Sequence, residues 1–370
     1  MSSLTIFVEL EAIRENIAAL RKIYGTRLLF MVKSNAYGHG IAEVAENTED
    51  LVDYFGTATA DEGVLLRRSG IKKPILTAVL KEREADIFTE YGLIAAVTRP
   101  SQLYALSRAA AEKRASVHIK IDSGMNRLGV KSREAFSELL TIADSLENVD
   151  VSGCYTHLFN AGDDGSLTAQ RNFFAELTDD TVSERGLLRH ISGGFPAILR
   201  ADLRFDMVRV GLAAYGCGDV YPPFGCVGNG THGMSDCGGA DAIILRRAMS
   251  AVAEVIESKT ARAGENVSYG NTRLLRDANI AVVSAGYGDG VSRRFGGGEL
   301  KIRGRRCAIL GVPCMDMLIV DTGDFQAFPG EPAVLLDDEL NAKYWAAISD
   351  TVPYEIVCGF HNRANYIYLK

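Results

Sequence analysis

Residues 28–40 read Leu28-Leu29-Phe30-Met31-Val32-Lys33-Ser34-Asn35-Ala36-Tyr37-Gly38-His39-Gly40, and this stretch decides the fold. It begins with a short, continuous apolar run, which is typical of a parallel strand that is buried on both faces. Lys33 ends the run, a loop over 34–40 follows, and a helix is expected to begin at Ile41. The stretch therefore predicts one strand, loop and helix unit of an α/β fold.

The same alternation continues on both sides of this stretch. A helix is predicted over 10–24, where apolar residues recur at helical spacing before Gly25. Further helices are predicted over 61–68 and 100–113, and further strands over 54–58, 75–79, 93–97, 117–121, 149–155, 188–191 and 207–212. About eight strands separated by helical stretches favour a (β/α)8 TIM-like barrel over an open sheet.

The pattern changes after Gly216. Residues 217–240 are rich in Gly, Cys, Asp and Pro, which predicts a long loop. Beyond it, strands are predicted over 251–256, 280–284, 307–310, 317–320 and 333–336. We therefore expect an N-terminal (β/α)8 barrel over 1–225 and a C-terminal mainly β domain over 226–370. The first strand of the chain is a candidate member of the β domain.

Composition excludes several classes of protein. The chain of 370 residues has a net charge of −7, which does not suit a protein that coats nucleic acid or an anionic membrane. It has no apolar run of membrane-spanning length, and its start does not resemble a signal peptide. Seven cysteines without matched C-x-x-C pairs argue against a disulfide framework and a metal site. We expect a cytoplasmic protein with reduced thiols and no metal.

Candidate catalytic residues lie where the predicted strands end. Lys33, Lys120, His157 and Gly193 fall at C-terminal strand ends, where barrels of this kind carry their chemistry. A lysine at the end of a buried strand is partly desolvated, which lowers its pKa and makes it a nucleophile able to form a Schiff base. On residue types alone, a lysine at the barrel rim without a chemical role is the more common case.

Several motifs together resemble those of the alanine racemase family. Residues 31–40 are similar to its signature around the lysine that binds pyridoxal 5′-phosphate (PLP), and residues 120–129 to its second signature. Residues 208–211 and 214–216 resemble its barrel-closing strand. Four further motifs match its C-terminal domain in order, namely residues 267–270, 286–290, 314–316 and 354–355. The matches extend over almost the whole chain.

The resemblance implies a PLP-dependent racemase that interconverts L-alanine and D-alanine with two bases. Lys33 is implied to hold PLP as a Schiff base and to act as one base. Tyr287 is implied to act on the opposite face from the partner subunit of a homodimer. Since a phenol has a pKa of about 10, such a site must stabilise its anion.

The resemblance also implies a role for each residue around the cofactor. Arg209 is implied to contact the pyridine nitrogen, and as a permanent cation it can only donate to that atom. Many PLP enzymes place a carboxylate there instead. His157 is implied to connect Arg209 with Tyr287. The implied phosphate contacts are Tyr37, Tyr354, Ser192, Gly193 and Gly194.

For the substrate, the resemblance implies that Arg127 binds the carboxylate, because a guanidinium offers two parallel donors. Cys314 and Met315 are implied to wall the pocket from the partner subunit, which favours a small side chain. Lys120 aligns with a position that is carbamylated in many family members. Carbamylation would turn this cation into an anion able to hold Arg127, and it remains a hypothesis.

The chain departs from the family pattern in places that bear on its substrate. Gly193-Gly194 replaces Asn-Ser, so Ser192 is a candidate for the missing phosphate hydroxyl. The family's Arg before Cys-Met-Asp is absent from residues 311–314, and its second C-terminal Arg is Tyr366. Alternatives are therefore a racemase of serine or of a basic amino acid, and a non-catalytic PLP-binding protein. A decarboxylase of related architecture would place a carboxylate at the pyridine nitrogen.

Overall fold

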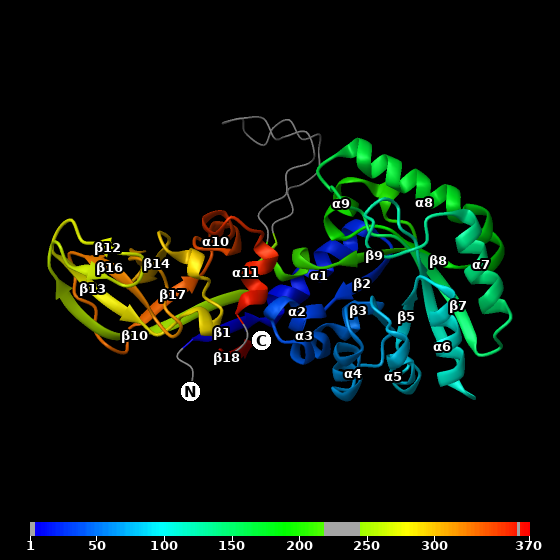
Figure 1. The fold of residues 1–370 in the computed structure, drawn as a ribbon, viewed down its shortest axis with the longest axis horizontal. Helices are drawn as coiled ribbons and strands as arrows, with labels where there is room; N and C mark the ends of the chain where they lie inside the picture. Colours follow the sequence, from blue (N-terminus) through cyan, green and yellow to red (C-terminus); the bar gives the residue numbers. More distant parts are fainter. Residues whose placement is uncertain (1–3, 218–244, 361–362) are drawn as a thin grey trace.

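A computed structural model describes residues 4–217, 245–360 and 363–370, which form a barrel beside a second sheet domain (Figure 1). Eight parallel strands make up the barrel sheet, in the order β8-β7-β6-β5-β4-β3-β2-β9. They are β2 (Arg27–Met31), β3 (Tyr54–Thr57), β4 (Ile75–Thr77), β5 (Ile94–Val97), β6 (Ala115–Lys120), β7 (Val149–Tyr155), β8 (Leu188–His190) and β9 (Met207–Val210). The predicted TIM-like barrel is confirmed.

The ring of strands closes between β8 and β9. The amide of Asp206 donates to the carbonyl of Arg189 over 3.1 Å, and the amide of Arg209 donates to the carbonyl of Ser192 over 3.1 Å. An isolated parallel bridge joins Gly193 to Arg209 just beyond β8. The closure therefore brings two predicted site segments side by side.

Helices cover the outside of the barrel (Figure 1). They are α1 (Leu10–Tyr24), α3 (Ile41–Thr48), α4 (Ala60–Arg68), α5 (Ala85–Tyr91), α6 (Pro100–Ala110), α7 (Arg133–Asp144), α8 (Asp164–Arg185) and α9 (Gly194–Leu199). Helix α1 has the predicted bounds, buries Ile13, Ile17 and Leu20, and ends at Gly25 in the left-handed region. Helix α6 ends at Ala110, three residues before its predicted end.

The second domain is built on a mainly antiparallel sheet with the order β13-β16-β15-β14-β17-β10-β1-β18, in which β1 and β18 run parallel. Its strands are β1 (Thr5–Glu9), β10 (Met249–Ala261), β13 (Ala278–Val283), β14 (Glu299–Ile302), β15 (Arg305–Ile309), β16 (Leu318–Gly323), β17 (Pro332–Leu336) and β18 (Asn365–Leu369), with a small hairpin of β11 (Asn266–Val267) and β12 (Thr272–Arg273). The first strand, β1, pairs with β10 and β18 and so lies in this sheet. The predicted boundary between residues 225 and 226 lies outside the described residues, as do residues 218–240 of the predicted loop.

Two helices of the second domain were not identified from the sequence, α10 (Ala342–Ser349) and α11 (Pro353–Gly359). Helix α11 contacts the short turn α2 (Lys33–Gly38) at the mouth of the barrel. The main hydrophobic core runs without a break from the barrel into the second domain. Within the described part of the chain, no helix is long and apolar enough to cross a membrane.

The α2 turn is left-handed, although the sequence analysis predicts an irregular loop there. Ser34, Asn35, Ala36 and Tyr37 all have φ between 53° and 54°, with ψ between 40° and 52°. For residues other than glycine this conformation costs roughly 1–2 kcal/mol each. The surrounding structure must therefore hold the turn in place.

Hydrogen bonds from several elements supply that support. The amide of Ser34 donates to Glu62 over 2.6 Å, and the amide of Ile41 donates to the side chain of Asn35 over 2.9 Å. The buried His39 ring contacts the carbonyls of Ala36 and Tyr37 at 3.1 and 3.0 Å. Helix α11 closes over the end of the turn, because a Cβ on Gly38 would lie 2.1 Å from the carbonyl oxygen of Val357.

This contact predicts that Gly38→Ala destabilises the protein much more than Gly25→Ala. Both glycines have positive φ, at 82° and 63°. Only Gly38 lies against backbone, whereas a Cβ on Gly25 would meet nothing within 4 Å. We expect a loss of about 1 kcal/mol for Gly25→Ala and at least about 3 kcal/mol for Gly38→Ala. Urea denaturation at one fixed protein concentration measures both, and equal losses would contradict the assigned packing.

Candidate active site

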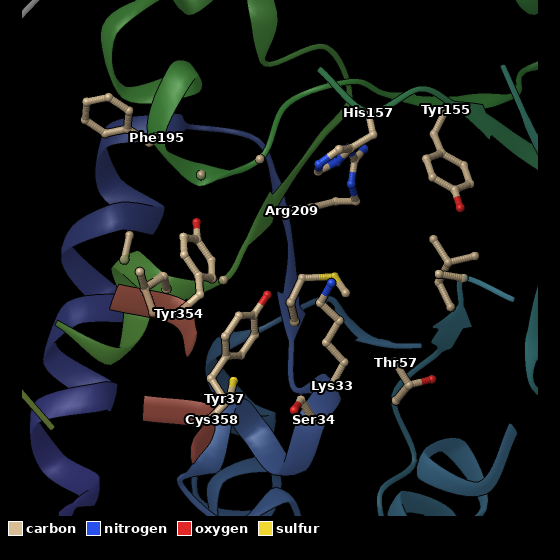
Figure 2. Close-up of a pocket in the computed structure, with 18 of the residues that line it drawn as sticks. Lys33, Ser34, Tyr37, Thr57, Tyr155, His157, Phe195, Arg209, Tyr354 and Cys358 are labelled. Carbon is tan, nitrogen blue, oxygen red and sulfur yellow. The ribbon is translucent and has the colours of Figure 1, made fainter. Parts of the chain in front are cut away.

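A cavity of about 450 Å³ opens at the C-terminal ends of the barrel strands. Figure 2 shows Lys33, Tyr37 and Tyr354 rising from one side of it toward Arg209 and His157. The cavity brings together nine of the residues predicted from the sequence: Lys33, Tyr37, Lys120, Arg127, His157, Gly193, Gly194, Arg209 and Tyr354.

Different elements supply these side chains. Lys33 follows β2, Lys120 ends β6 and Arg209 lies on β9, so the barrel strands fix three of them. Tyr354 lies on α11 and comes from the second domain. The hydroxyl oxygen of Tyr37 packs against Gly211, where a Cβ would lie 2.8 Å from it. One wall of the cavity therefore depends on the contact between the two domains.

The cavity is strongly cationic. Lys33, Lys120, Arg127 and Arg209 line it, and none of the lining residues is an Asp or a Glu. Burial lowers the pKa of Lys33, and the positive charges of Arg127 and Arg209 lower it further. Burial and the same two guanidinium groups lower the pKa of Lys120 to about 8. Because like charges near one another are costly, the cavity favours neutral amines and anionic ligands.

Arg209 is buried and held by several acceptors. Its Nη1 donates to the carbonyl of His190 over 3.0 Å and lies 2.8 Å from His190 Nδ1. Its Nη2 donates to the carbonyls of Thr156 and Ile191 over 2.7 and 3.0 Å, and lies 3.4 Å from His157 Nδ1. Burial lowers the pKa of this guanidinium to about 10, so it stays protonated near neutral pH. Within the described residues its Nε donates no hydrogen bond. A donor therefore remains for a ligand in the cavity.

The histidines around Arg209 are neutral. Burial, assisted by the charge of Arg209, lowers the pKa of His157 to about 3 and that of His190 well below its usual value. His190 Nε2 lies 2.9 Å from Nδ1 of His118, whose pKa burial lowers to about 3. Tyr155 stacks on His190 with ring centroids 4.8 Å apart. Neutral rings leave acceptor nitrogens for the guanidinium and fix its orientation.

Four of the predicted site residues do not line this cavity. Ser192 is fully buried, and its hydroxyl donates to the carbonyl of Gly193 over 2.6 Å, which does not fit the proposed phosphate contact. Tyr287, Cys314 and Met315 lie in the second domain, where the amide of Tyr287 donates to the carbonyl of Cys314 over 3.0 Å. The side chain of Tyr287 is 39% exposed and that of Met315 is 53% exposed.

Several lining residues were not predicted from the sequence. Thr57 and Tyr155 end strands whose predicted bounds already contained them, so their position at strand ends was a usable signal. Cys358 lies on α11, beside the turn that carries Lys33. Burial raises the pKa of this thiol, while a hydrogen bond from Ser34 and the charge of Lys33 oppose the shift. The sequence has no periodic pattern that predicts α11, the helix on which Cys358 lies.

The residues present fit PLP. The cofactor needs an amine for its aldehyde, a partner for its ring nitrogen and donors for its phosphate. Lys33 supplies the amine, and the Nε–H of Arg209 is the remaining donor of a group that can only donate. Hydroxyls and glycine amides supply phosphate donors, and a Cβ on Gly193 would meet nothing within 4 Å, which leaves space beside that amide. Because no Asp or Glu lines the cavity, no carboxylate there would repel the phosphate dianion.

Comparisons with known proteins agree with this geometry. Residues 8–219 match the family model of the alanine racemase N-terminal domain, and residues 248–368 match that of the alanine racemase C-terminal domain. An alanine racemase from Symbiobacterium thermophilum is 34% identical over 98% of this chain and 96% of its own length. One from Salinispora arenicola is 35% identical over 95% of this chain and 94% of its own length.

Solved structures show the same likeness. The alanine racemase of Clostridium difficile 630 superposes with a TM-score of 0.88 at 27% identity, covering 100% of this chain and 96% of its own. That of the D-cycloserine producer Streptomyces lavendulae superposes with a TM-score of 0.87 at 30% identity, covering 100% of this chain and 98% of its own. The similarity therefore includes both domains.

The neutral histidines of the barrel predict a loss of stability in acid. A buried neutral histidine takes up its proton only on unfolding, so the unfolded chain binds more protons below about pH 6.5. The free energy of unfolding is therefore unaffected by these groups above that pH. It falls as the pH drops toward 4, by up to about 1.4 kcal/mol per pH unit for each such group. Urea unfolding at several pH values measures the slope.

A matched pair of variants isolates one histidine. His118→Asn should remove about one of the protons that the chain takes up on unfolding, and so reduce the pH dependence of the free energy of unfolding, because this ring takes up its proton only in the unfolded chain. Ser152→Ala removes a hydrogen bond of 2.7 Å with Ser116 and carries no titrating group, so it should leave the slope unchanged. An undiminished slope in His118→Asn would show that this ring is already charged in the fold.

Proposed function

Because this chain belongs to the alanine racemase family, we propose that it interconverts L-alanine and D-alanine with PLP bound at Lys33. The observation that carries the proposal is the charge of the cavity around Lys33, which has four cationic side chains and no acid. Such a lining suits a phosphate and an amino-acid carboxylate together. The lining has no carboxylate side chain for a basic substrate, and the carbamate proposed below would be paired with Arg127, which favours alanine over a basic amino acid.

The cofactor would be held at three points. Lys33 would bind its aldehyde, and the Nε–H of Arg209 would donate to its ring nitrogen. The hydroxyls of Tyr37 and Tyr354 and the amides of Gly193 and Gly194 would bind the phosphate. When bound, PLP supplies the electron sink that makes the Cα proton of the amino acid removable.

The proton transfers fall to two side chains. Lys33, whose pKa burial lowers, takes up or returns a proton at Nζ on one face of the substrate. The partner subunit's Tyr287 does the same on the opposite face, and Arg127 binds the carboxylate. Tyr287, Cys314 and Met315 do not line the cavity of their own chain, which supports their contribution to the site of a partner in a homodimer.

Lys120 is proposed to carry a carbamate. Its pKa of about 8 leaves much of the amine neutral under mildly alkaline conditions, and the neutral amine is the form that attacks carbon dioxide. The reaction joins the nitrogen to the carbon of carbon dioxide and releases one proton. The lysine would then carry a negative instead of a positive charge, and this anion could pair with Arg127.

We also infer a cytoplasmic location. The seven cysteines cannot all pair within one chain, and the five in the described residues, Cys154, Cys217, Cys307, Cys314 and Cys358, are free thiols. Free thiols suit a reducing compartment. The partners expected are a small amino acid and a second copy of the chain.

The activity is tested by a chiral assay of purified protein with PLP and either enantiomer of alanine. Wild type should bring both to an equal mixture, whereas Lys33→Ala and Tyr287→Phe should each lower the rate by about 10³-fold. Lys113→Ala, at an exposed surface lysine, serves as the control. No D-alanine from L-alanine with wild type would refute the function.

Mixing the two inactive variants tests the shared site. In a mixed dimer, Lys33 of one chain faces the Tyr287 of the other, so one of the two sites is complete. Random exchange of subunits should restore about a quarter of the wild-type activity. No recovery, with mixed dimers verified by mass, would mean that each chain uses its own Tyr287.

A crystal structure of the protein grown in bicarbonate tests the carbamate. We expect electron density for a planar group of three atoms on Nζ of Lys120, within hydrogen-bond distance of Arg127. In ¹³C-bicarbonate the wild type should also give a carbamate signal that is missing from Lys120→Ala. A bare ammonium group at position 120 in both measurements would refute the modification.

A further inference from the structure

Three segments of the second domain meet at the side chain of Arg363. Its Nε donates to the carbonyl of Gly288 over 3.1 Å and lies 3.1 Å from a carboxylate oxygen of Asp289. Its Nη1 donates to Asp316 over 2.8 Å, and its Nη2 donates to the carbonyl of Met315 over 3.3 Å. One guanidinium therefore joins the short helix η6 (Tyr287–Asp289) to residues 314–316 and to the start of β18.

The backbones of the two loops are also bonded to each other. The amide of Tyr287 donates to the carbonyl of Cys314 over 3.0 Å, and the amide of Gly288 donates to that of Met315 over 2.8 Å. The carboxylate of Asp289 closes its own turn by accepting the amide of Gly286 over 2.9 Å. Asp289 is buried, and a buried carboxylate needs a compensating cation. Arg363 is that cation.

The packing around the guanidinium leaves no spare room. A Cβ on Gly288 would lie 2.1 Å from Nη2 of Arg363, and a Cβ on Gly286 would lie 2.3 Å from the carbonyl oxygen of Met315. The ring of Tyr287, by contrast, is 39% exposed, so packing around the ring fixes it only in part. The backbone of its turn must therefore determine where the phenol stands.

From these contacts we infer that Arg363 is a positioning residue for racemisation, which locks the turn of Tyr287 to the loop of Met315. This inference rests on the proposed function, in which Tyr287 works in the partner's cavity. Arg363 touches neither cofactor nor substrate; it acts through Asp289, Asp316 and two backbone carbonyls. The exposed pair with Asp316 contributes little to overall stability, whereas the pair with the buried Asp289 holds the turn. Its loss here should instead shift the turn, and a displacement of about 1 Å at a reacting group can lower a rate by about 100-fold.

The test follows exchange of the Cα proton for deuterium in D₂O, separately for L-alanine and D-alanine, with holoenzyme. Tyr287→Phe identifies the enantiomer whose proton Tyr287 removes. Arg363→Ala should slow exchange of that same enantiomer by about 100-fold and leave the other within about threefold of wild type. KM should change little, because Arg127 and the barrel wall bind the substrate. Arg363→Lys keeps the charge but not the planar guanidinium, so its exchange rate for that enantiomer should lie between those of wild type and Arg363→Ala.

Two further variants keep the inference falsifiable if Arg363→Ala folds poorly. Asp316→Asn removes one anchor and keeps the buried pair with Asp289, so it should produce a smaller loss confined to the same enantiomer. Arg276→Ala removes an exposed ion pair of the same domain, with Asp321 at 2.7 Å, and should leave both exchange rates unchanged.

The outcomes separate this inference from the proposed function. Equal slowing of both enantiomers by Arg363→Ala, or no slowing of either, would overturn the positioning role while wild-type exchange stands. A wild type that exchanges neither enantiomer would overturn the proposed function itself.

Discussion

Positive charge gathered at the mouth of the barrel is the constraint on which the rest of the site depends. Lys33, Lys120, Arg127 and Arg209 line one cavity, and no lining carboxylate offsets them. Burial lowers the pKa of both lysines, and the charges of Arg127 and Arg209 lower it further. Arg209 remains charged because backbone carbonyls and neutral histidines accept its hydrogen bonds. The proposed anionic cofactor and anionic substrate would complete the charge balance that the chain leaves open.

Holding those charges in place requires both domains. The left-handed turn after β2 directs Lys33 into the cavity, and α11 of the second domain packs on the end of that turn. The same helix supplies Tyr354 to the cavity wall. Strain in the turn is therefore offset by hydrogen bonds within the barrel and by packing that forms only when the two domains are assembled. Tyr287 and Met315, in contrast, stay exposed in the assembled chain.

Much of the fold could be predicted from the sequence, because local patterns of apolar residues indicate its strands. The apolar run before Lys33 and the strand over 149–155 have the predicted bounds to within a residue or two. The left-handed turn could not be predicted, since Ala36 and Tyr37 have no preference for positive φ and only tertiary contacts impose it. Ser192 points inward because β8 and β9 close the barrel beside it, which is a non-local event. The contacts between Arg209 and His190 likewise join separate strands and leave no periodic signal.

Chemical trapping at Lys33 tests the central claim most directly, because Lys120 in the same cavity competes for the aldehyde. The purified protein is incubated with PLP, reduced with borohydride, digested, and analysed by peptide mass spectrometry. We expect the PLP-derived mass on the peptide that contains Lys33, at a stoichiometry near one per chain. A label on Lys120 instead, or no label on either lysine, would contradict the account.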